Sequence, residues 1–146
     1  MRFSQIIIDI KLSKPQYLGY VSGVFDVFHQ GHQKYIEKCQ QKCDALVIGV
    51  DSDHRVKEMK GPSRPFDDQY LREKNVERIN EYVFVKMLPS SRYINVLRPN
   101  VLFYPSDAPE KGEKLTKLHK CCKVIMIEVT PSVSSTNIIN SIVSSL

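Results

Sequence analysis

The sequence predicts an α/β protein built on a doubly wound, five-stranded parallel sheet with helices on both faces, in a single domain. Its length of 146 residues is the size of one compact domain. Hydrophobic residues make up 42% of the chain and charged residues 25%, a balance that supports a buried core and excludes general disorder. Short apolar runs alternate with segments of helical periodicity, and this alternation is typical of parallel strands joined by helices.

Five apolar runs are predicted to be strands because they are short, uninterrupted and rich in β-branched or aromatic residues. In chain order they are Tyr17–Val24, Ala45–Val50, Tyr82–Leu88, Val101–Tyr104 and Val124–Val129. Runs of this kind fit strands that are buried on both faces, as in a parallel sheet covered by two layers of helices. We expect right-handed crossover connections between them.

Four segments are predicted to be helices because their apolar residues recur at helical spacing. They are Gln33–Lys42, Asp67–Glu81, Glu113–Lys120 and Thr136–Leu146. In the last segment five aliphatic side chains share one face: Ile138, Ile139, Ile142, Val143 and Leu146. Together with the strands, these helices predict a Rossmann-like domain over residues 17–146.

Residues 1–16 stand outside this pattern as an N-terminal extension. The stretch Phe3–Leu12 is largely apolar. It is predicted to form an extra edge strand or an arm that contacts a second subunit, and a loosely attached terminus is the alternative.

Composition and patterning narrow the classes of function. The longest nearly uncharged apolar run, residues 6–10, is far shorter than the ~20 residues that cross a bilayer, so no membrane span is predicted. Asp9 and Lys11 break the pattern of a secretory signal, and we expect a cytoplasmic protein. The cysteines at 39, 43, 121 and 122 lack the spacing of zinc sites and are predicted to be reduced thiols. A net charge of +5 is too small to predict a nucleic-acid partner.

The segment from 22 to 32, SGVFDVFHQGH, joins the first predicted strand to the first predicted helix. In open α/β sheets this junction binds ligands, and the amides at a helix start favour an anion. Gly23 would let the backbone approach a nucleotide, and Gly31 would leave room for a phosphate. His29 and His32 can present two ring N–H donors to one transferring phosphoryl group. Two structural histidines, or part of a metal site, are the alternatives.

This segment strongly resembles the signature GxFDxxHxGH of the cytidylyltransferase-like nucleotidylyltransferases. All of its fixed positions are met, by Gly23, Phe25, Asp26, His29, Gly31 and His32. A lone HxGH would be a weak signal, whereas this longer form directly after a predicted strand is specific. The resemblance extends over about residues 17–142.

Three further segments agree with this family in order and spacing. The stretch Lys60–Pro65 (KGPSRP) resembles the family's loop from the second strand, in which a lysine meets nucleotide phosphates. Arg72 matches the family's arginine on the following helix. The stretch Val133–Ile139 resembles the motif (I/V)S(S/T)TxII, whose hydroxyls and helix amino terminus hold the triphosphate.

The resemblance implies transfer of a nucleoside monophosphate from a nucleoside triphosphate to a phosphorylated acceptor, with release of pyrophosphate. It implies that His29 and His32 contact the α-phosphate, and that Lys60 and Arg72 contact the phosphate charge. Further nucleotide contacts are expected from Gly23, Val24, Phe25, Gly31, Asp107, Ser134, Ser135 and Thr136, and substrate contacts from Asp26 and Arg64.

Magnesium is expected to accompany the nucleotide, bound mainly through the phosphates with at most one carboxylate. Asp26 is the candidate ligand. An equal alternative is that its side chain caps the turn.

The base and the acceptor are less sharply indicated. The family's glycerol-phosphate cytidylyltransferases carry RTxGIST before the final motif, and the arginine and glycine are missing from residues 129–134. The Lys60–Pro65 run and the SSTNII run look like bacterial sugar-phosphate adenylyltransferases, especially those acting on heptose 1-phosphate. ATP is therefore favoured over CTP, and the expected acceptor is a phosphorylated sugar or polyol.

One departure keeps two alternatives open. Those adenylyltransferases follow the fourth strand with a Lys-Gly-Gly-Asp-Tyr loop, whereas residues 103–109 (FYPSDAP) retain only Asp107. The alternatives are a CTP-dependent enzyme acting on an alcohol phosphate, and a nucleotide-binding protein without turnover. Small transferases of this kind are often dimers, and we expect a homodimer.

Overall fold

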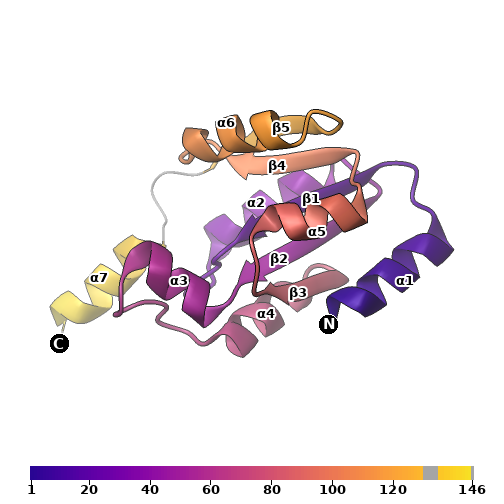
Figure 1. The fold of residues 1–146 in the computed structure, drawn as a ribbon. Coiled ribbons are helices and arrows are strands. Elements are labelled where there is room, and N and C mark those ends of the chain that lie inside the picture. Colours follow the sequence, from indigo (N-terminus) through magenta and orange to yellow (C-terminus); the bar gives the residue numbers. More distant parts are fainter. Residues whose placement is uncertain (130–134, 146) are drawn as a thin grey trace.

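The computed structural model describes residues 1–129 and 135–145, and it has the predicted doubly wound sheet (Figure 1). All five strands pair in parallel, in the order β3-β2-β1-β4-β5. They are β1 (Leu18–Gly23), β2 (Ala45–Asp51), β3 (Tyr82–Lys86), β4 (Val101–Pro105) and β5 (Lys123–Ile127). Each one overlaps a predicted strand.

Seven helices are described. They are α1 (Phe3–Ser13), α2 (Gln30–Gln40), α3 (Asp53–Lys60), α4 (Gln69–Glu77), α5 (Ser90–Leu97), α6 (Pro109–Leu118) and α7 (Ser135–Ser145). In the described parts of the chain, none of them has the length and apolar character needed to span a membrane.

The sheet separates two hydrophobic cores. Residues of α2 and α4 pack on one face, around Val21 and Phe103. Residues of α1, α5 and α6 pack on the other face, around Tyr20 and Phe84. Val21 and Tyr20 are neighbours on β1 that point to opposite faces, which is why continuous apolar runs were the correct signal for strands buried on both sides.

The prediction of an edge strand at Phe3–Leu12 is wrong, because this stretch is helix α1. Phe3, Ile6, Ile7 and Ile10 follow the spacing i, i+3, i+4 and i+7, and all four pack in the second core. Ile6 is fully buried there. The free energy gained by burying these side chains outweighs the preference of isoleucine for strands, so packing determines that this stretch is a helix.

Two other helices, α3 and α5, were not predicted. Helix α3 buries a single apolar residue, Val56, so its periodicity is faint. Its clearest signal is the Ser52 hydroxyl, which accepts a hydrogen bond from the amide of Arg55 as an N-cap. Helix α5 buries Ile94 and Leu97 and makes the crossover from β3 to β4.

The strand order creates a switch point between β1 and β4. From β1 the chain proceeds through β2 to β3, and then returns to place β4 on the other side of β1. In such sheets a crevice opens at the carboxyl ends of the two strands that flank the switch, and ligands bind there. The loop that follows β1, residues 24–29, lies at this point.

Candidate functional site

The loop after β1 is held in a strained conformation. Phe25 and Val27 have positive φ angles of 53° and 47°, in the left-handed region that side chains, and β-branched ones above all, rarely adopt. Strain of this kind persists only where surrounding contacts enforce it, and it is concentrated at functional sites. The contacts that enforce it here come from the residue between them, Asp26.

The Asp26 carboxylate is 1% exposed and fastens this loop to the segment before α4. One oxygen accepts from the amides of Val27 (3.1 Å) and Asp67 (2.9 Å). The other accepts from the amide of Phe66 (2.8 Å) and from Nε of Arg64 (3.2 Å). With four nitrogen donors on its two oxygens, Asp26 does not fit a magnesium ligand, and the capping alternative fits better.

The grouping of the remaining described side chains also bears on a metal site. No group of three or more His, Cys, Asp or Glu side chains within residues 1–129 and 135–145 is arranged to hold an ion.

His29 and His32 cap the start of α2 reciprocally. Nδ1 of His29 accepts from the amide of Gly31 (3.0 Å), and Nδ1 of His32 accepts from the amide of His29 (3.3 Å). A neutral imidazole that accepts through Nδ1 carries its proton on Nε2. The cap therefore assigns both rings the tautomer in which Nε2–H is a donor.

The two rings are stacked and kept neutral. Their centroids lie 3.8 Å apart with planes at 21°, and the ring of Phe28 stacks against His32 at 5.4 Å. Burial, and then the neighbouring His29, lowers the pKa of His32 to about 3. Burial also lowers the pKa of His29. At neutral pH the pair consists of two uncharged rings with their Nε2–H groups in place.

Buried polar atoms without a partner mark this site. Among the described residues, three buried side-chain atoms make no hydrogen bond: Nε2 of His29, Nη2 of Arg64 and the hydroxyl of Tyr35. Native proteins leave few buried donors unsatisfied, and such atoms call for a ligand or another partner. One belongs to the imidazole pair, one to the arginine that Asp26 holds, and one to α2, which the pair caps.

Lys60 lies within electrostatic range of Arg64, Asp26 and Asp107. Burial, followed by the charge of Arg64, lowers the pKa of Lys60, whereas Asp26 and Asp107 oppose that shift. The charge of Lys60 also contributes to lowering the pKa of His32. Lys60 thus lies within electrostatic range of His32, and Arg64 and Asp107 lie within electrostatic range of Lys60.

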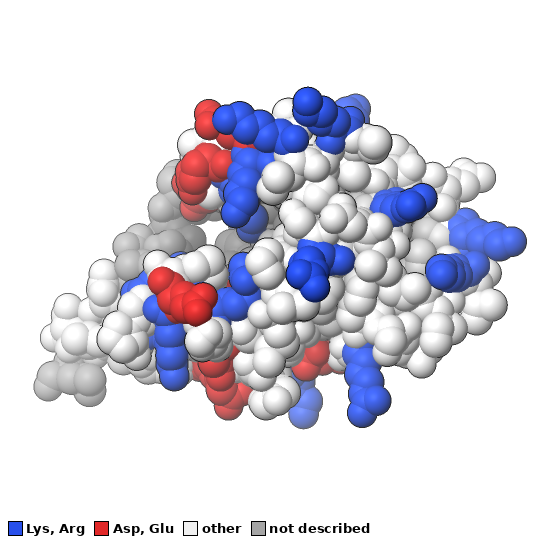
Figure 2. Space-filling model, in the orientation of Figure 1, with Lys and Arg blue, Asp and Glu red and all other residues white. Residues whose placement is uncertain are grey.

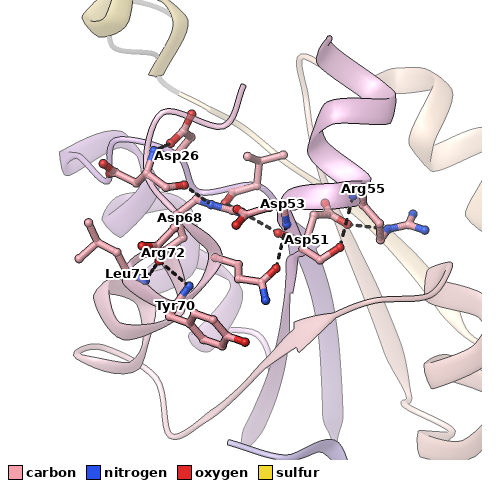
Figure 3. Close-up of polar contacts among 12 residues, drawn as sticks. Asp26, Asp51, Asp53, Arg55, Asp68, Tyr70, Leu71 and Arg72 are labelled. Atoms are coloured by element: carbon pink, nitrogen blue, oxygen red, sulfur yellow. Dashed lines mark hydrogen bonds and ion pairs between the residues drawn. The ribbon is translucent and has the colours of Figure 1, made fainter. Parts of the chain in front are cut away.

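Arg72 has a different environment from the one expected for a phosphate ligand. Its side chain is fully buried, and Figure 3 shows it beside Asp51 and Asp53. Nε donates to the carbonyl of Asp67 (2.9 Å), Nη1 to the carbonyls of Val24 (2.9 Å) and Asp51 (2.6 Å), and Nη2 to Oδ1 of Asp53 (2.8 Å). Four of its five N–H groups therefore hold protein segments together.

The remaining residues of the first motif are structural in part. A Cβ at Gly23 would lie 3.0 Å from the ring of Phe25, so the glycine makes room for that ring. Phe25 is buried in the first core, and its ring meets His32 edge-on at 5.6 Å. The carbonyl of Val24 is taken by Arg72. Gly31 contributes the amide that fixes His29.

The final motif is described only in part. Ser134 lies outside the described residues, while Ser135 and Thr136 are the first residues of α7. Figure 1 places α7 at the end of the molecule where the strands have their carboxyl ends, which is the end that the motif requires. The predicted contacts of these hydroxyls with a triphosphate stay a prediction.

Sequence reasoning missed two groups of residues near the site. Lys111, on the first turn of α6, reaches back to the carbonyl of Ser22 on β1 (2.9 Å). Asp51 and Lys86, at the ends of β2 and β3, form a buried ion pair (2.9 Å). Their positions at strand and helix ends were a weak signal, because only the strand order shows that these ends meet at one edge of the sheet.

Residues 20–141 match the family model described as cytidylyltransferase-like. Among curated proteins, the chain is 32% identical over 126 residues to the bifunctional protein HldE of Campylobacter fetus, covering 84% of this chain and 27% of that protein. It is 29% identical over 142 residues to the HldE protein of Syntrophotalea carbinolica, covering 93% and 29%. The chain thus spans less than a third of these relatives.

Two solved structures share the fold. A lipopolysaccharide core biosynthesis protein from Thermoplasma volcanium superposes with a TM-score of 0.63 at 19% identity, covering 78% of this chain and 96% of that one. A pantothenate synthetase from Thermus thermophilus superposes with a TM-score of 0.64 at 14% identity, covering 90% and 65%. At these identities the likeness concerns the fold alone.

Proposed function

The chain belongs to the cytidylyltransferase-like family, and we propose that it is a nucleotidyltransferase that moves a nucleoside monophosphate from a nucleoside triphosphate to a phosphorylated sugar or polyol. The observation that carries this proposal is the pair of neutral imidazoles at the start of α2, each with Nε2–H as its donor. Such a pair suits a phosphoryl group on which negative charge builds up.

In the proposed reaction, a phosphate oxygen of the acceptor attacks the α-phosphorus of the nucleotide. The bond from that phosphorus to the oxygen bridging the α- and β-phosphates breaks, and pyrophosphate leaves with the electron pair. Nε2–H of His29 and of His32 donate to the α-phosphate oxygens, where placed donors stabilise the transition state. The cations of Lys60 and Arg64 offset the phosphate charge.

Arg72 is given an indirect role in this proposal. Its bond to the carbonyl of Val24 fixes the loop that leads to the histidines, and its bonds to Asp51 and Asp53 fix the end of β2 and the start of α3. We infer that it positions the site rather than binding phosphate. Magnesium enters with the nucleotide through the phosphates, because Asp26 is already occupied by protein donors.

ATP is the favoured nucleotide and a phosphorylated sugar the favoured acceptor. The support is the likeness of the segments at 60–65 and 134–139 to sugar-phosphate adenylyltransferases, together with the absence of the RTxGIST arginine. The matches to HldE proteins are consistent with it. Use of CTP with an alcohol phosphate, a homodimer and a cytoplasmic location stay predictions.

The direct test is pyrophosphate release. The purified protein is incubated with Mg²⁺, one of ATP, CTP, GTP or UTP, and each of a set of sugar and polyol phosphates, and pyrophosphate is measured with a coupled assay. We expect release with ATP and at least one sugar phosphate, and a nucleotide-dependent rise in Tm that is largest with ATP. A rise in Tm without pyrophosphate from any pair would instead support a nucleotide-binding protein without turnover.

A further inference from the structure

A second group of cations lies on the α5–α6 side of the sheet, at the carboxyl ends of β1, β2 and β3. Lys86 and Asp51 are 4% and 5% exposed, and Nζ of Lys86 donates to Oδ1 of Asp51 (2.9 Å). Nε of Arg55 donates to the same oxygen (3.2 Å). One carboxylate is therefore shared between two cations, which leaves positive charge in excess.

Lys111 adds a third cation that has no carboxylate. Its ammonium donates to the carbonyl of Ser22, and within the described residues no acidic oxygen lies within 4.0 Å of it. Burial lowers the pKa of Lys111 to about 8, although the charge of Asp51 acts in the opposite direction. A desolvated ammonium without a counter-ion is costly, and a bound anion would relieve that cost.

The second cation cluster, defined as Arg55, Lys86 and Lys111, lies at the same edge of the sheet as the loop that carries the imidazoles. Ser22, which Lys111 contacts, directly precedes the loop that carries the histidines. Asp51 and Asp107 are within electrostatic range of both Lys111 and Lys60. Figure 2 shows a hollow between α6 and α3, with Lys and Arg side chains on both of its sides.

We propose that Arg55, Lys86 and Lys111 bind the phosphate group of the acceptor. This inference rests on the proposed function. In the reaction two anions must meet, because the acceptor phosphate approaches a triphosphate. Their repulsion is strong at contact distance, and a cation surplus beside the incoming phosphate offsets it. The cluster provides that surplus from residues that lie outside the sequence motifs.

The test distinguishes the second cation cluster from the nucleotide site by giving each its own ligand. Inorganic phosphate serves as the probe for the second cation cluster, while α,β-methylene-ATP with Mg²⁺ occupies the nucleotide site, and both are titrated by calorimetry. We expect saturable phosphate binding with the analogue present. Lys111→Met should raise the Kd for phosphate about tenfold or more, while the Kd for the analogue changes less than about twofold. Lys117→Met, an exposed lysine on the same helix, should change neither.

A variant that preserves the charge distinguishes loss of the cation from loss of the folded structure. Lys111→Arg should keep phosphate binding within about threefold of the wild-type value, and the thermal unfolding of each variant shows whether it is folded. The proposal is overturned if phosphate does not bind, if Lys111→Met binds it as the wild type does, or if that variant weakens the analogue equally. Should the analogue fail to bind the wild-type protein, the preference for ATP fails and the titration is repeated with the corresponding CTP analogue. If neither analogue binds, the nucleotidyl-transfer proposal fails, and phosphate titration without an analogue still decides on the second cation cluster.

Discussion

Two parts of the loop between β1 and α2 are equally polar but are used in opposite ways. In the first part, the polar groups around Asp26 are bonded within the protein. Both carboxylate oxygens of Asp26 accept from protein donors, and Arg72 joins the same loop to β2. In the second part, His29 and His32 accept backbone hydrogen bonds through their Nδ1 atoms only. Nε2 of His29 is left without a partner among the described residues. Residues of one motif thus divide into those whose polar groups are bonded within the protein and those that keep a donor for a proposed ligand.

The largest expected effect tests the holding part. Arg72→Met removes a fully buried cation and leaves Asp53 and three carbonyls without its donors. We expect a loss of about 3–5 kcal/mol in the free energy of unfolding, measured by urea denaturation. A stable variant that has lost only turnover would show instead that Arg72 acts directly on phosphate, as the sequence motif implied.

The next effect tests the part that faces the ligand. His32→Ala removes one Nε2–H donor, and we expect turnover to fall by about 10²–10³-fold, equivalent to about 3–4 kcal/mol. The cost in stability should be about 1–2 kcal/mol, because a helix cap and the ring contacts with His29, Phe25 and Phe28 are lost. His54→Ala is the matched control, since His54 lies on the exposed surface and, among the described residues, pairs with Glu58 alone. Near-normal turnover of the His32 variant would contradict the proposed mechanism.

Asp26→Asn sharpens the comparison without removing the side chain. The amide retains one accepting oxygen but turns an NH₂ group toward donors such as the amides of Phe66 or Val27. We expect a loss of about 2 kcal/mol in unfolding free energy, and a loss of turnover no larger than the loss of loop structure explains. A variant of normal stability whose activity needs more Mg²⁺ would instead restore Asp26 as a metal ligand.

Lys60→Met tests a charge on the rim of the site. Lys60 makes no hydrogen bond or ion pair with the described residues, so the fold should not depend on it. We expect KM for the nucleotide to rise about tenfold while the free energy of unfolding stays within about 0.5 kcal/mol of the wild-type value. An unchanged KM would place the nucleotide phosphates elsewhere.

The last prediction concerns stability in acid. The pKa of His32 is about 3 in the folded protein, against 6.5 for an ordinary histidine. Between pH 6.5 and 3, His32 is therefore protonated in the unfolded chain but not in the folded protein. The free energy of unfolding should decline as pH falls through this range. In His32→Asn this decline should be shallower, as measured by urea denaturation at several pH values. Parallel curves for the two proteins would mean that His32 titrates normally.

The fold could be predicted from the sequence to a large extent, because burial on both faces of the sheet leaves continuous apolar runs such as Ala45–Val50. Elements that bury few residues were missed. Helix α3 buries Val56 alone, and α1 was misread because its isoleucines favour strands. In α1 the spacing of Phe3, Ile6, Ile7 and Ile10 was the better guide.

The candidate site divides in the same manner. A short motif sufficed to locate His29 and His32, because the chemistry lies in consecutive residues. The roles of Asp26 and Arg72 depend on distant partners. Asp26 accepts from Arg64, 38 positions away, and Arg72 donates to Val24, 48 positions away, and the spacing of residues in the sequence does not indicate these contacts. Lys111 was missed for the same reason, since only the tertiary structure brings it to Ser22.

For the proposed reaction, the reciprocal cap at the start of α2 also predicts which acceptors can be used. Both Nδ1 atoms already receive backbone hydrogens, and both Nε2 atoms carry a proton, so neither ring has a free lone pair to take up another. The pair can stabilise charge but cannot act as a proton relay. A free alcohol must be deprotonated to become a nucleophile, whereas a phosphate ester is an anion before it arrives. Unphosphorylated sugars should therefore be inert in this crevice, however well they fit.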